Sequence, residues 1–523
     1  MSVQSGKLIL KILTEQFGET IAAVGYDLFR HGSRPVAHIH STTKLPISEI
    51  KHSLCILAKY KLITFTSSAH PDFAEYELLN ERVFYIVRYP KYICRIKDKY
   101  GDEAEVLLDE LLRLGSCTAS ELIVRCLARV KEQYPSNLCD LVSLRDKFVD
   151  MVHGNYLCRC PVPITESSVP SLFLDEAHMF VMPDIDLREL SKMQNGSEGK
   201  PGDENVYWVC NFSKFHQDMR DELMISAMTR RIDECAGEVM KCLLQQMYVR
   251  TDAWEQQSNA IPFVELKQTC AETSEDKYPN IIPFLDQYLK IIVEDSSQFL
   301  KKIGDASGGQ YVINVALAME QLAWCCLENY IVQRFSSKSA RIFRVVRTHK
   351  FIEQELIQKR AMIPDKEAKQ LTYELLENHF IKLRVINKGG QQGSIKNFFL
   401  FTVDLMESVY VLLDMTEKAL LNVMTRRQLS MQENIRLLQK QQRVESLVNT
   451  MKIRGDPEEH IKDIEDTLTP ADHETIAKAK REMDMLGISE IKLDETLFLL
   501  KVYLFYSKKP DTVGKCNCCN YRP

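Results

Sequence analysis

The sequence has 523 residues, which is too long for one compact core and indicates roughly three to five domains. Hydrophobic residues make up 45% and charged residues 27%, a composition that excludes a disordered or collagen-like chain. The net charge of -5, from 67 basic and 72 acidic residues, excludes a strong overall attraction to DNA or to an anionic membrane. Any contact with nucleic acid must therefore be local.

The N-terminus carries no apolar signal-peptide core, and no stretch approaches the roughly 18 uninterrupted apolar residues of a membrane span. The 16 cysteines are scattered, many of them in apolar helical stretches, where a thiol packs as a small hydrophobic group. We therefore expect a soluble chain in a reducing compartment, the cytosol or the nucleus.

Residues 1–88 carry the pattern of one winged helix. Apolar residues three and four apart predict helices over residues 7–17 and 19–30, a polar segment follows, and a further helix opens at Pro46. Two strands are expected on either side of a polar turn at residues 67–72. Three helices followed by a two-stranded wing are the parts of a winged helix-turn-helix.

The same parts recur three more times, which indicates an internal repeat. Residues 331–403 give the clearest copy, with three predicted helices and two strands around a glycine-rich turn. Its Pro364 aligns with Pro46, and apolar positions after the two prolines also correspond. Residues 89–160 give a second copy, and residues 206–330 give a weaker one that is supported by the order of its helices rather than by matching residues.

Between the second and third copies, residues 161–205 are rich in Pro, Ser and Gly, which predicts a linker. One apolar stretch inside it, residues 171–184, predicts a strand pair or a docked segment. It contains Asp175-Glu176-Ala177-His178, the letters of a helicase-type nucleotide-hydrolysis motif. That chemistry also needs a glycine-rich phosphate loop of the form GxxxxGK[ST], which the sequence lacks, so we interpret the four letters as coincidence.

Beyond residue 404 the chain runs about 45 residues without Gly or Pro, which predicts a long helix that ends at Gly455. Residues 458–486 and 489–506 predict two returning helices, so residues 404–506 should form an antiparallel coiled-coil bundle, followed by a flexible tail at residues 507–523. The predicted fold is mainly α with small wings: four tandem winged helices and a C-terminal helical bundle.

Catalytic and metal-binding patterns are missing from the sequence. The glycine-rich stretch at residues 304–310 lacks the spacing and the lysine of a phosphate loop, and a wing hairpin explains it better. The short cysteine and histidine spacings, including Cys516, Cys518 and Cys519 in the tail, do not form the paired sets that zinc favours. We expect no metal, no cofactor, no small-molecule substrate and no enzymatic activity in this chain alone.

Basic residues mark the candidates for DNA contact, because a winged helix places its third helix in the major groove and its wing on the flanking backbone. The fourth copy has the most basic residues, which also include Lys382 and Arg384 about the wing. The competing interpretation is that these residues lie on solvated faces or contact protein. No third-helix set of Arg, Asn and Gln indicates base reading. The candidates are Arg341, Arg344, Arg347, Lys350, Lys366, Lys369, Lys388 and Lys396, with Lys51 and Lys59 in the first copy.

Several stretches together resemble one family closely: the large winged-helix subunit of the RNA polymerase III initiation heterotrimer, which is related to the α subunit of the general factor TFIIE. The resemblance covers nearly the whole chain. It is carried by residues 89–93, 207–221, 308–314, 340–380, 398–403 and 489–500.

This resemblance implies four winged helices plus a C-terminal coiled coil, a nuclear location, and docking on the clamp of the RNA polymerase III core together with two smaller subunits. It also implies a role in promoter opening through DNA contacts without sequence specificity, including contacts with single strands. RNA synthesis would then belong to the two largest subunits of the polymerase.

A polymerase III initiation subunit is therefore the leading hypothesis. The alternative is a multi-winged-helix docking scaffold in another intracellular assembly of the proteasome-lid or signalosome kind, although such proteins place solenoid helices before a single winged helix. A third hypothesis is a sequence-specific repressor, for which binding without preference among duplex sequences would be contrary evidence.

Overall fold

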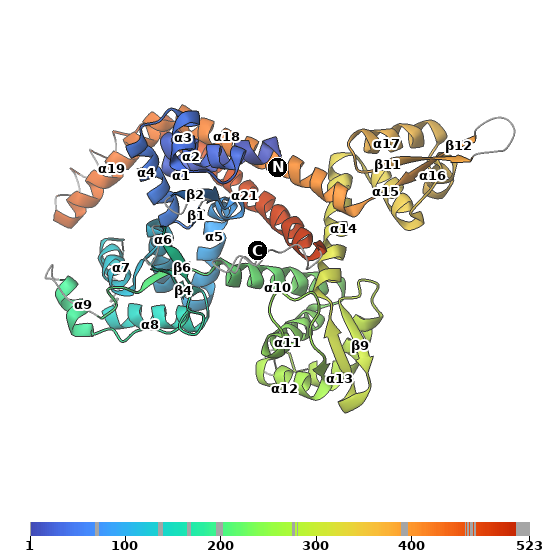
Figure 1. The fold of residues 1–523 in the computed structure, drawn as a ribbon, viewed down its shortest axis with the longest axis horizontal. Helices are drawn as coiled ribbons and strands as arrows, with labels where there is room; N and C mark the ends of the chain where they lie inside the picture. The colour runs from blue at the N-terminus through green and yellow to red at the C-terminus, as the bar shows by residue number, and fades with distance from the viewer. Residues whose placement is uncertain are drawn as a thin grey trace.

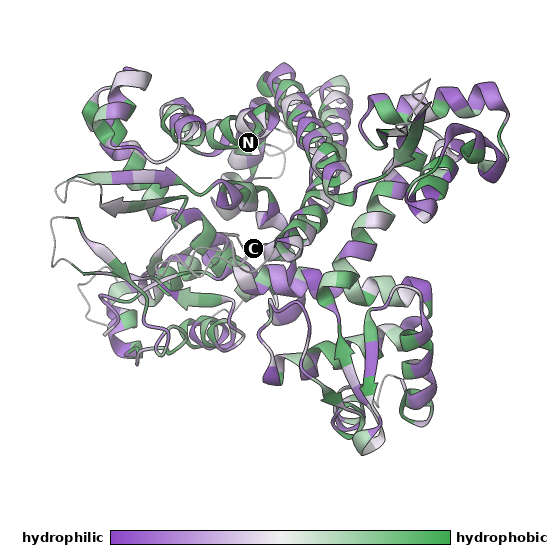
Figure 2. Ribbon diagram, turned by 45° about the vertical axis from the view of Figure 1, so that its right-hand side comes forward, coloured by the Kyte–Doolittle hydropathy of each residue, from purple (hydrophilic) through white to green (hydrophobic). Residues whose placement is uncertain are grey.

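A computed structural model shows how these elements are arranged (Figure 1). It describes residues 2–67, 73–133, 140–164, 169–194, 202–274, 278–279, 281–388, 396–454, 457, 460, 464 and 467–508. Within these residues helices dominate, and five small antiparallel sheets accompany them. Many helices alternate between apolar and polar residues along their length, as amphipathic helices on a shared core do (Figure 2). None of the described helices is long and apolar enough to cross a membrane.

The first winged helix consists of α2, α3, α4 and a two-stranded wing, and α1 precedes it. Gly18, at a φ of 91°, separates α1 from α2 in a conformation that favours glycine. Ile50, Leu54 and Leu57 line the buried face of α4. The structure adds α3 within the predicted polar segment. Ile39 is the one buried residue of α3, so the sequence there shows no series of apolar residues at helical spacing. The elements are α1 (Val3–Phe17), α2 (Glu19–His31), α3 (Val36–Thr43), α4 (Ile47–Lys59), β1 (Ile63–Ser67) and β2 (Ala74–Leu78).

The second winged helix differs from its predicted boundary at residue 160. Its sheet has the order β3-β7-β4, and the central strand β7 comes from beyond the linker. Trp208 on β7 is fully buried and meets the ring of Phe148 edge-on at 5.4 Å, so the core of this unit needs that strand. The elements are α5 (Asn80–Tyr100), α6 (Asp102–Leu114), β3 (Cys117–Thr118), α7 (Ala119–Gln133), α8 (Leu141–His153), β4 (Leu157–Arg159) and β7 (Tyr207–Cys210).

The predicted linker is anchored where the structure describes it. Strands β5 (Val162–Ile164) and β6 (Ser171–Phe173) form a hairpin, and α9 (Leu187–Gln194) contacts α7 and α8. Near the end of the linker, the buried carboxylate of Asp203 accepts hydrogen bonds from the backbone N–H and the hydroxyl of Ser120, both at 2.8 Å. The segment therefore folds back along the second winged helix and delivers β7 to its sheet.

The third winged helix contains two elements that the sequence analysis did not predict, β8 and α12. Its sheet has the order β8-β10-β9. Gly308 and Gly309 lie between β9 and β10 with φ values of 84° and 125°, so they form the predicted wing turn. The elements are α10 (Phe212–Arg231), α11 (Glu234–Arg250), β8 (Ile261–Pro262), α12 (Phe263–Ser274), α13 (Ile281–Glu294), β9 (Leu300–Gly304) and β10 (Gln310–Ile313).

The fourth winged helix contains the three helices and two strands expected from its sequence, and α14 leads into it. Ile352 pairs with Phe401 across an isolated bridge and extends the sheet beyond the hairpin. Phe343 and Phe380 fill the core. The elements are α14 (Val315–Arg334), α15 (Ser337–His349), α16 (Gln354–Ala361), α17 (Asp365–Glu377), β11 (Lys382–Lys388) and β12 (Lys396–Thr402).

The C-terminal helices form a hairpin, with two differences from the prediction. The long helix is interrupted at Asn434 into α18 (Leu405–Glu433) and α19 (Ile435–Arg454). The two predicted returning helices are one helix, α21 (Pro470–Ser507), which continues through Gly487 and packs along α18. A capping box between Thr469 and Asp472 fixes its start. The predicted fold class, mainly α with small wings and a C-terminal helical bundle, is confirmed.

Helices α5, α10 and α21 meet at the centre of the molecule (Figure 1). Arg88 on α5 donates from Nε to both carboxylate oxygens of Asp494 on α21, at 2.9 and 2.8 Å. Nε2 of His216 on α10 lies 2.7 Å from the hydroxyl of Tyr92 and 3.4 Å from Nη1 of Arg88. All four side chains are buried, so this ion pair and its neighbours tie three distant parts of the chain together.

A second buried arginine reinforces the same junction. Arg220 on α10 donates to the hydroxyls of Tyr248 and Tyr506, each at 2.7 Å, and pairs with Asp221 at 2.7 Å. Its guanidinium carbon also lies 5.0 Å from the ring centroid of Trp254. Because Tyr506 belongs to the last turn of α21, Arg220 fixes the C-terminal helix on the third winged helix.

Candidate nucleic-acid interface

Two of the predicted DNA contacts, Arg344 and Arg347 on α15, face α14. Arg344 Nε and Arg347 Nη1 each lie 2.8 Å from a carboxylate oxygen of Glu328. Arg347 also stacks its guanidinium carbon 4.2 Å from the ring centroid of Trp324. Both arginines therefore join the fourth winged helix to α14, and their charge is already partnered within the chain.

The other predicted residues near α15 are less engaged. Arg341 donates to the carbonyl of Ala361 at 3.3 Å, a contact between α15 and the end of α16. Lys350 ends α15 in a left-handed conformation at a φ of 60°, and its side chain is exposed. Of these two, only Lys350 presents its charge to solvent without a hydrogen bond or ion pair to a described residue.

The third helix of this unit, α17, has an acidic excess. It carries two basic residues, Lys366 and Lys369, against four acidic ones at positions 365, 367, 374 and 377. Lys369 lies 2.9 Å from the carboxylate of Asp365, one turn earlier, whereas Lys366 is exposed. A helix with this balance repels phosphate overall, so the major-groove position expected of a third helix is electrostatically unfavourable here.

The wing of the fourth winged helix carries the opposite balance. Its strands contain Lys382, Arg384, Lys388 and Lys396 and no acidic residue. Lys382 pairs with Glu407 at the start of α18, while Arg384 is exposed and lies 5.6 Å from the ring centroid of Phe351. Lys388 and Lys396 pair across the two strands at the end of the ladder, and their side chains lie outside the described residues.

Apolar side chains are exposed on both faces of the same wing. Val385 faces Phe399 across the ladder, and Ile386 faces Phe398, so the two pairs lie on opposite faces of the hairpin. Phe398 and Phe399 remain 41% and 52% exposed. The hairpin extends away from the helical junction at the edge of the molecule (Figure 1). Cationic and aromatic groups thus share one projecting element, a combination suited to nucleic acid or to an acidic partner.

The two candidates in the first winged helix lie on the solvent face of α4. Lys51 and Lys59 are exposed, and neither forms an ion pair with a described residue. Exposed His52 lies beside them, whereas Glu49 on the same helix opposes their charge. This face is a weaker cationic surface than the fourth wing.

The remaining motifs have structural roles or lie outside the described residues. Asp175 and His178 form a contact of 2.6 Å with each other in an exposed turn of the linker. No cluster of three potential metal ligands occurs in the described residues. Cys516, Cys518 and Cys519 lie outside them.

Comparison with known proteins gives matches along most of the chain. Family models match residues 7–68 (RNA polymerase III subunit RPC82 helix-turn-helix domain), 168–322 (RNA polymerase III subunit RPC82), 327–403 (POLR3C, C-terminal winged-helix domain) and 436–499 (DNA-directed RNA polymerase III subunit RPC3, helical hairpin domain). The last match covers most of α19 and of α21. The first two matches leave residues 69–167 between them, and these residues contain the second winged helix from α5 to β4. Its strand β7 lies within the second match.

Curated relatives extend this likeness over whole chains. The DNA-directed RNA polymerase III subunit RPC3 of Homo sapiens is 32% identical over 534 residues, which cover 95% of this chain and 98% of the relative. The chain belongs to the RPC3 family of RNA polymerase III subunits. The RPC3 subunit of Rattus norvegicus is 33% identical with the same coverage, and that of Danio rerio is 30% identical over 96% of this chain and 99% of the relative.

Membership in the RPC3 family confirms the predicted resemblance, and it supports the prediction that the chain is not an enzyme by itself. Two of the stretches that carry the resemblance, residues 207–221 and 340–380, lie within the family matches at 168–322 and 327–403. The partner of Arg344 and Arg347 was not detectable, because Glu328 lies on α14, a helix that was not predicted, and only the packing of α15 on α14 brings them together.

Proposed function

We propose that this RPC3-family chain is a docking and initiation subunit of RNA polymerase III in the nucleus. It would bind the clamp of the polymerase core together with two smaller subunits and assist promoter opening. Family membership supports its place in the complex. A buried junction that joins the second and third winged helices to the C-terminal hairpin supports a docking role, because it holds several separate surfaces on one frame.

The proposed DNA contact is the wing of the fourth winged helix. The observation that carries it is the basic excess of β11 and β12, which have four cationic and no acidic residues. Phosphate contact from a wing gives affinity without sequence readout, which agrees with the acidic balance of α17. The proposed contact therefore consists of Arg384, Lys388 and Lys396, with exposed Lys350 and Lys366 elsewhere in the same winged helix. Arg344 and Arg347 are left out of it because both pair with Glu328.

Reversal of three wing charges, Arg384→Glu with Lys388→Glu and Lys396→Glu, is expected to weaken binding of the complete polymerase to promoter DNA. Each lost phosphate contact lowers the slope of log K against log salt by roughly 0.7–0.9, so the slope should fall by about 2–3. Fluorescence anisotropy across a salt series measures this, and the subunit composition of the variant polymerase checks its assembly.

The matched control is Arg344→Glu with Arg347→Glu on the same winged helix. Because these side chains pair with Glu328, their reversal should loosen α15 from α14 and leave the salt slope near that of the unaltered enzyme. A reduced slope in this control with an unchanged slope in the wing variant would place the DNA on α15 instead.

The proposed assembly is tested by affinity purification of the full chain from nuclei. Polymerase III subunits should be recovered in fixed proportion. Recovery of the chain free of polymerase, or with another intracellular assembly, would favour the alternative of a docking scaffold elsewhere. A sequence-specific repressor is disfavoured because the exposed face of α17 offers Lys366, Lys369 and Gln370 among acidic neighbours.

A further inference from the structure

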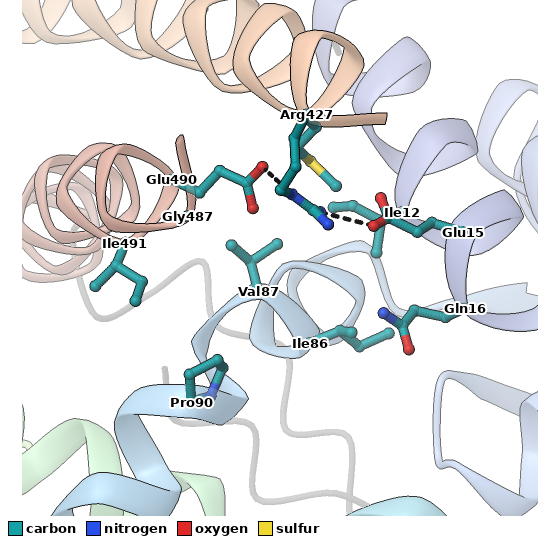
Figure 3. Close-up of a pocket in the computed structure, with 11 residues that line it drawn as sticks. Ile12, Glu15, Gln16, Ile86, Val87, Pro90, Arg427, Gly487, Glu490 and Ile491 are labelled. Carbon is teal, nitrogen blue, oxygen red and sulfur yellow. Dashed lines mark hydrogen bonds and ion pairs between the residues drawn. The ribbon is translucent and has the colours of Figure 1, made fainter. Parts of the chain in front are cut away.

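A pocket of about 300 Å³ lies where α1, α5, α18 and α21 meet (Figure 3). Apolar side chains from all four helices form most of its wall. Its lining residues are Ile12, Glu15, Gln16, Ile86, Val87, Pro90, Met424, Arg427, Gly487, Glu490 and Ile491. Such a volume accommodates one bulky side chain, and apolar walls stabilise it by excluding water.

Two helix-weakening residues line this pocket from different helices. Pro90 lies inside α5, which continues to Tyr100, and it has no N–H to donate to the carbonyl of Ile86 four residues earlier. That carbonyl therefore lacks its usual helical donor. Gly487 lies in the interior of the 38-residue helix α21, where glycine costs roughly 1 kcal/mol relative to alanine. A methyl group added at Gly487 would meet no packing partner within 4 Å, so packing inside this chain does not require the glycine.

The polar part of the wall combines the carboxylates of Glu15 and Glu490, the guanidinium of Arg427 and the amide of Gln16. Arg427 donates from Nε to Glu490 at 2.7 Å and from Nη2 to Glu15 at 2.6 Å, and Figure 3 shows it held between them. Burial raises the pKa of Glu490, and Arg427 opposes that change. Two carboxylates therefore share one guanidinium, and an occupant that brings a hydrogen-bond donor would complement them.

We infer that this pocket, the α1–α21 socket, receives an aromatic side chain with an N–H or O–H donor, a tryptophan or tyrosine, from a partner polypeptide of the polymerase. The ring would fill the apolar volume beside Gly487, and its donor would meet the carboxylates or the Ile86 carbonyl. Aromatic anchors buried in pockets dominate many protein interfaces. The inference rests on the place of the chain in the polymerase and is independent of the DNA contact.

Filling the socket from within tests the inference. Gly487→Leu replaces a weak helix former and occupies the volume, so the purified full chain should unfold about 1–3 °C higher. Its affinity for the partner should nevertheless fall at least about 30-fold, the loss expected of a central anchor. Gly487→Ala fills less of the socket and should lower the affinity for the partner by a smaller factor. It keeps the test informative if Gly487→Leu disturbs folding.

The partner is identified by photo-cross-linking in purified polymerase. Benzoyl-phenylalanine at Gln16, on the rim of the socket, should cross-link to a tryptophan- or tyrosine-containing peptide of another subunit, and Gly487→Leu should abolish the product. The control is the same probe at Met485, an exposed residue on α21 outside the socket.

Four results would overturn the inference: a product within residues 509–523 of this chain, a product with a second copy of it, a yield unchanged by Gly487→Leu, or no product at Gln16. Failure of the wild-type chain to copurify with any polymerase subunit is a separate outcome. It would contradict the proposed assembly rather than the socket.

Discussion

Asp494→Ala is expected to destabilise the central junction by about 3–5 kcal/mol, because it leaves the buried guanidinium of Arg88 without its counter-ion. The two side chains are only 3% and 2% exposed. Burial opposes the charge on Arg88, and Asp494 outweighs it, so the pKa of Arg88 is raised in the intact junction. The variant loses that support, but the intrinsic pKa of a guanidinium is high enough that the group stays charged. Hydrogen exchange of the amides in α5, α10 and α21 measures the loss.

An exposed ion pair provides the control for this variant. Asp286 and Lys290 pair at 2.7 Å on the surface of α13, where Asp286→Ala should change stability by less than about 0.5 kcal/mol. Replacement of both buried partners, Arg88→Met with Asp494→Leu, should recover much of the lost stability, since it removes the unpaired charge. A loss below about 1 kcal/mol for Asp494→Ala would show that water reaches Arg88 in the junction.

Trp208→Ala is expected to cost about 3–5 kcal/mol, as truncation of a large buried aromatic residue does. The effect should appear in the second winged helix, because β7 lies between β3 and β4 in its sheet. Protection of α8 amides should fall with it, since Phe148 on α8 loses its ring contact. Hydrogen exchange followed for individual amides distinguishes this loss of protection from changes in the third winged helix.

Tyr207→Ala, one residue earlier on the same strand, is the matched control. Tyr207 is 49% exposed, so its truncation should cost less than about 1 kcal/mol. If Trp208→Ala loosened the third winged helix and spared the second, β7 would belong energetically to the unit that follows it in sequence.

The parts of the fold that depend on local pattern were predictable. Helices such as α4 and α15 show apolar residues at helical spacing, and Pro46 and Pro364 stand at the starts of their third helices. The short helix α3 was missed because Ile39 alone is buried on it. The break expected near Gly487 does not occur, because packing along α18 outweighs the low helix propensity of one glycine.

The parts that depend on distant partners were not predictable. Nothing near Tyr207 in sequence indicates that its strand completes a sheet whose other strands lie before the linker. The charge of Arg344 and Arg347 was visible, but its neutralisation by Glu328 follows from how α15 packs on α14. The acidic residues of α17 are visible in the sequence, and weighing them against Lys366 and Lys369 was a signal that could have directed the prediction from this helix to the wing.

The ion pair between Arg88 and Asp494 also has a consequence for synthesis of the chain. The two residues are 406 positions apart, so at ribosomal rates of about 5–20 residues per second Arg88 waits roughly 20–80 s for its partner. During that interval the nascent N-terminal half exposes a cation and the apolar surface that α21 will cover. A message that stops early would yield chains that never bury this charge, and such products present a distinct target for chaperones and proteases.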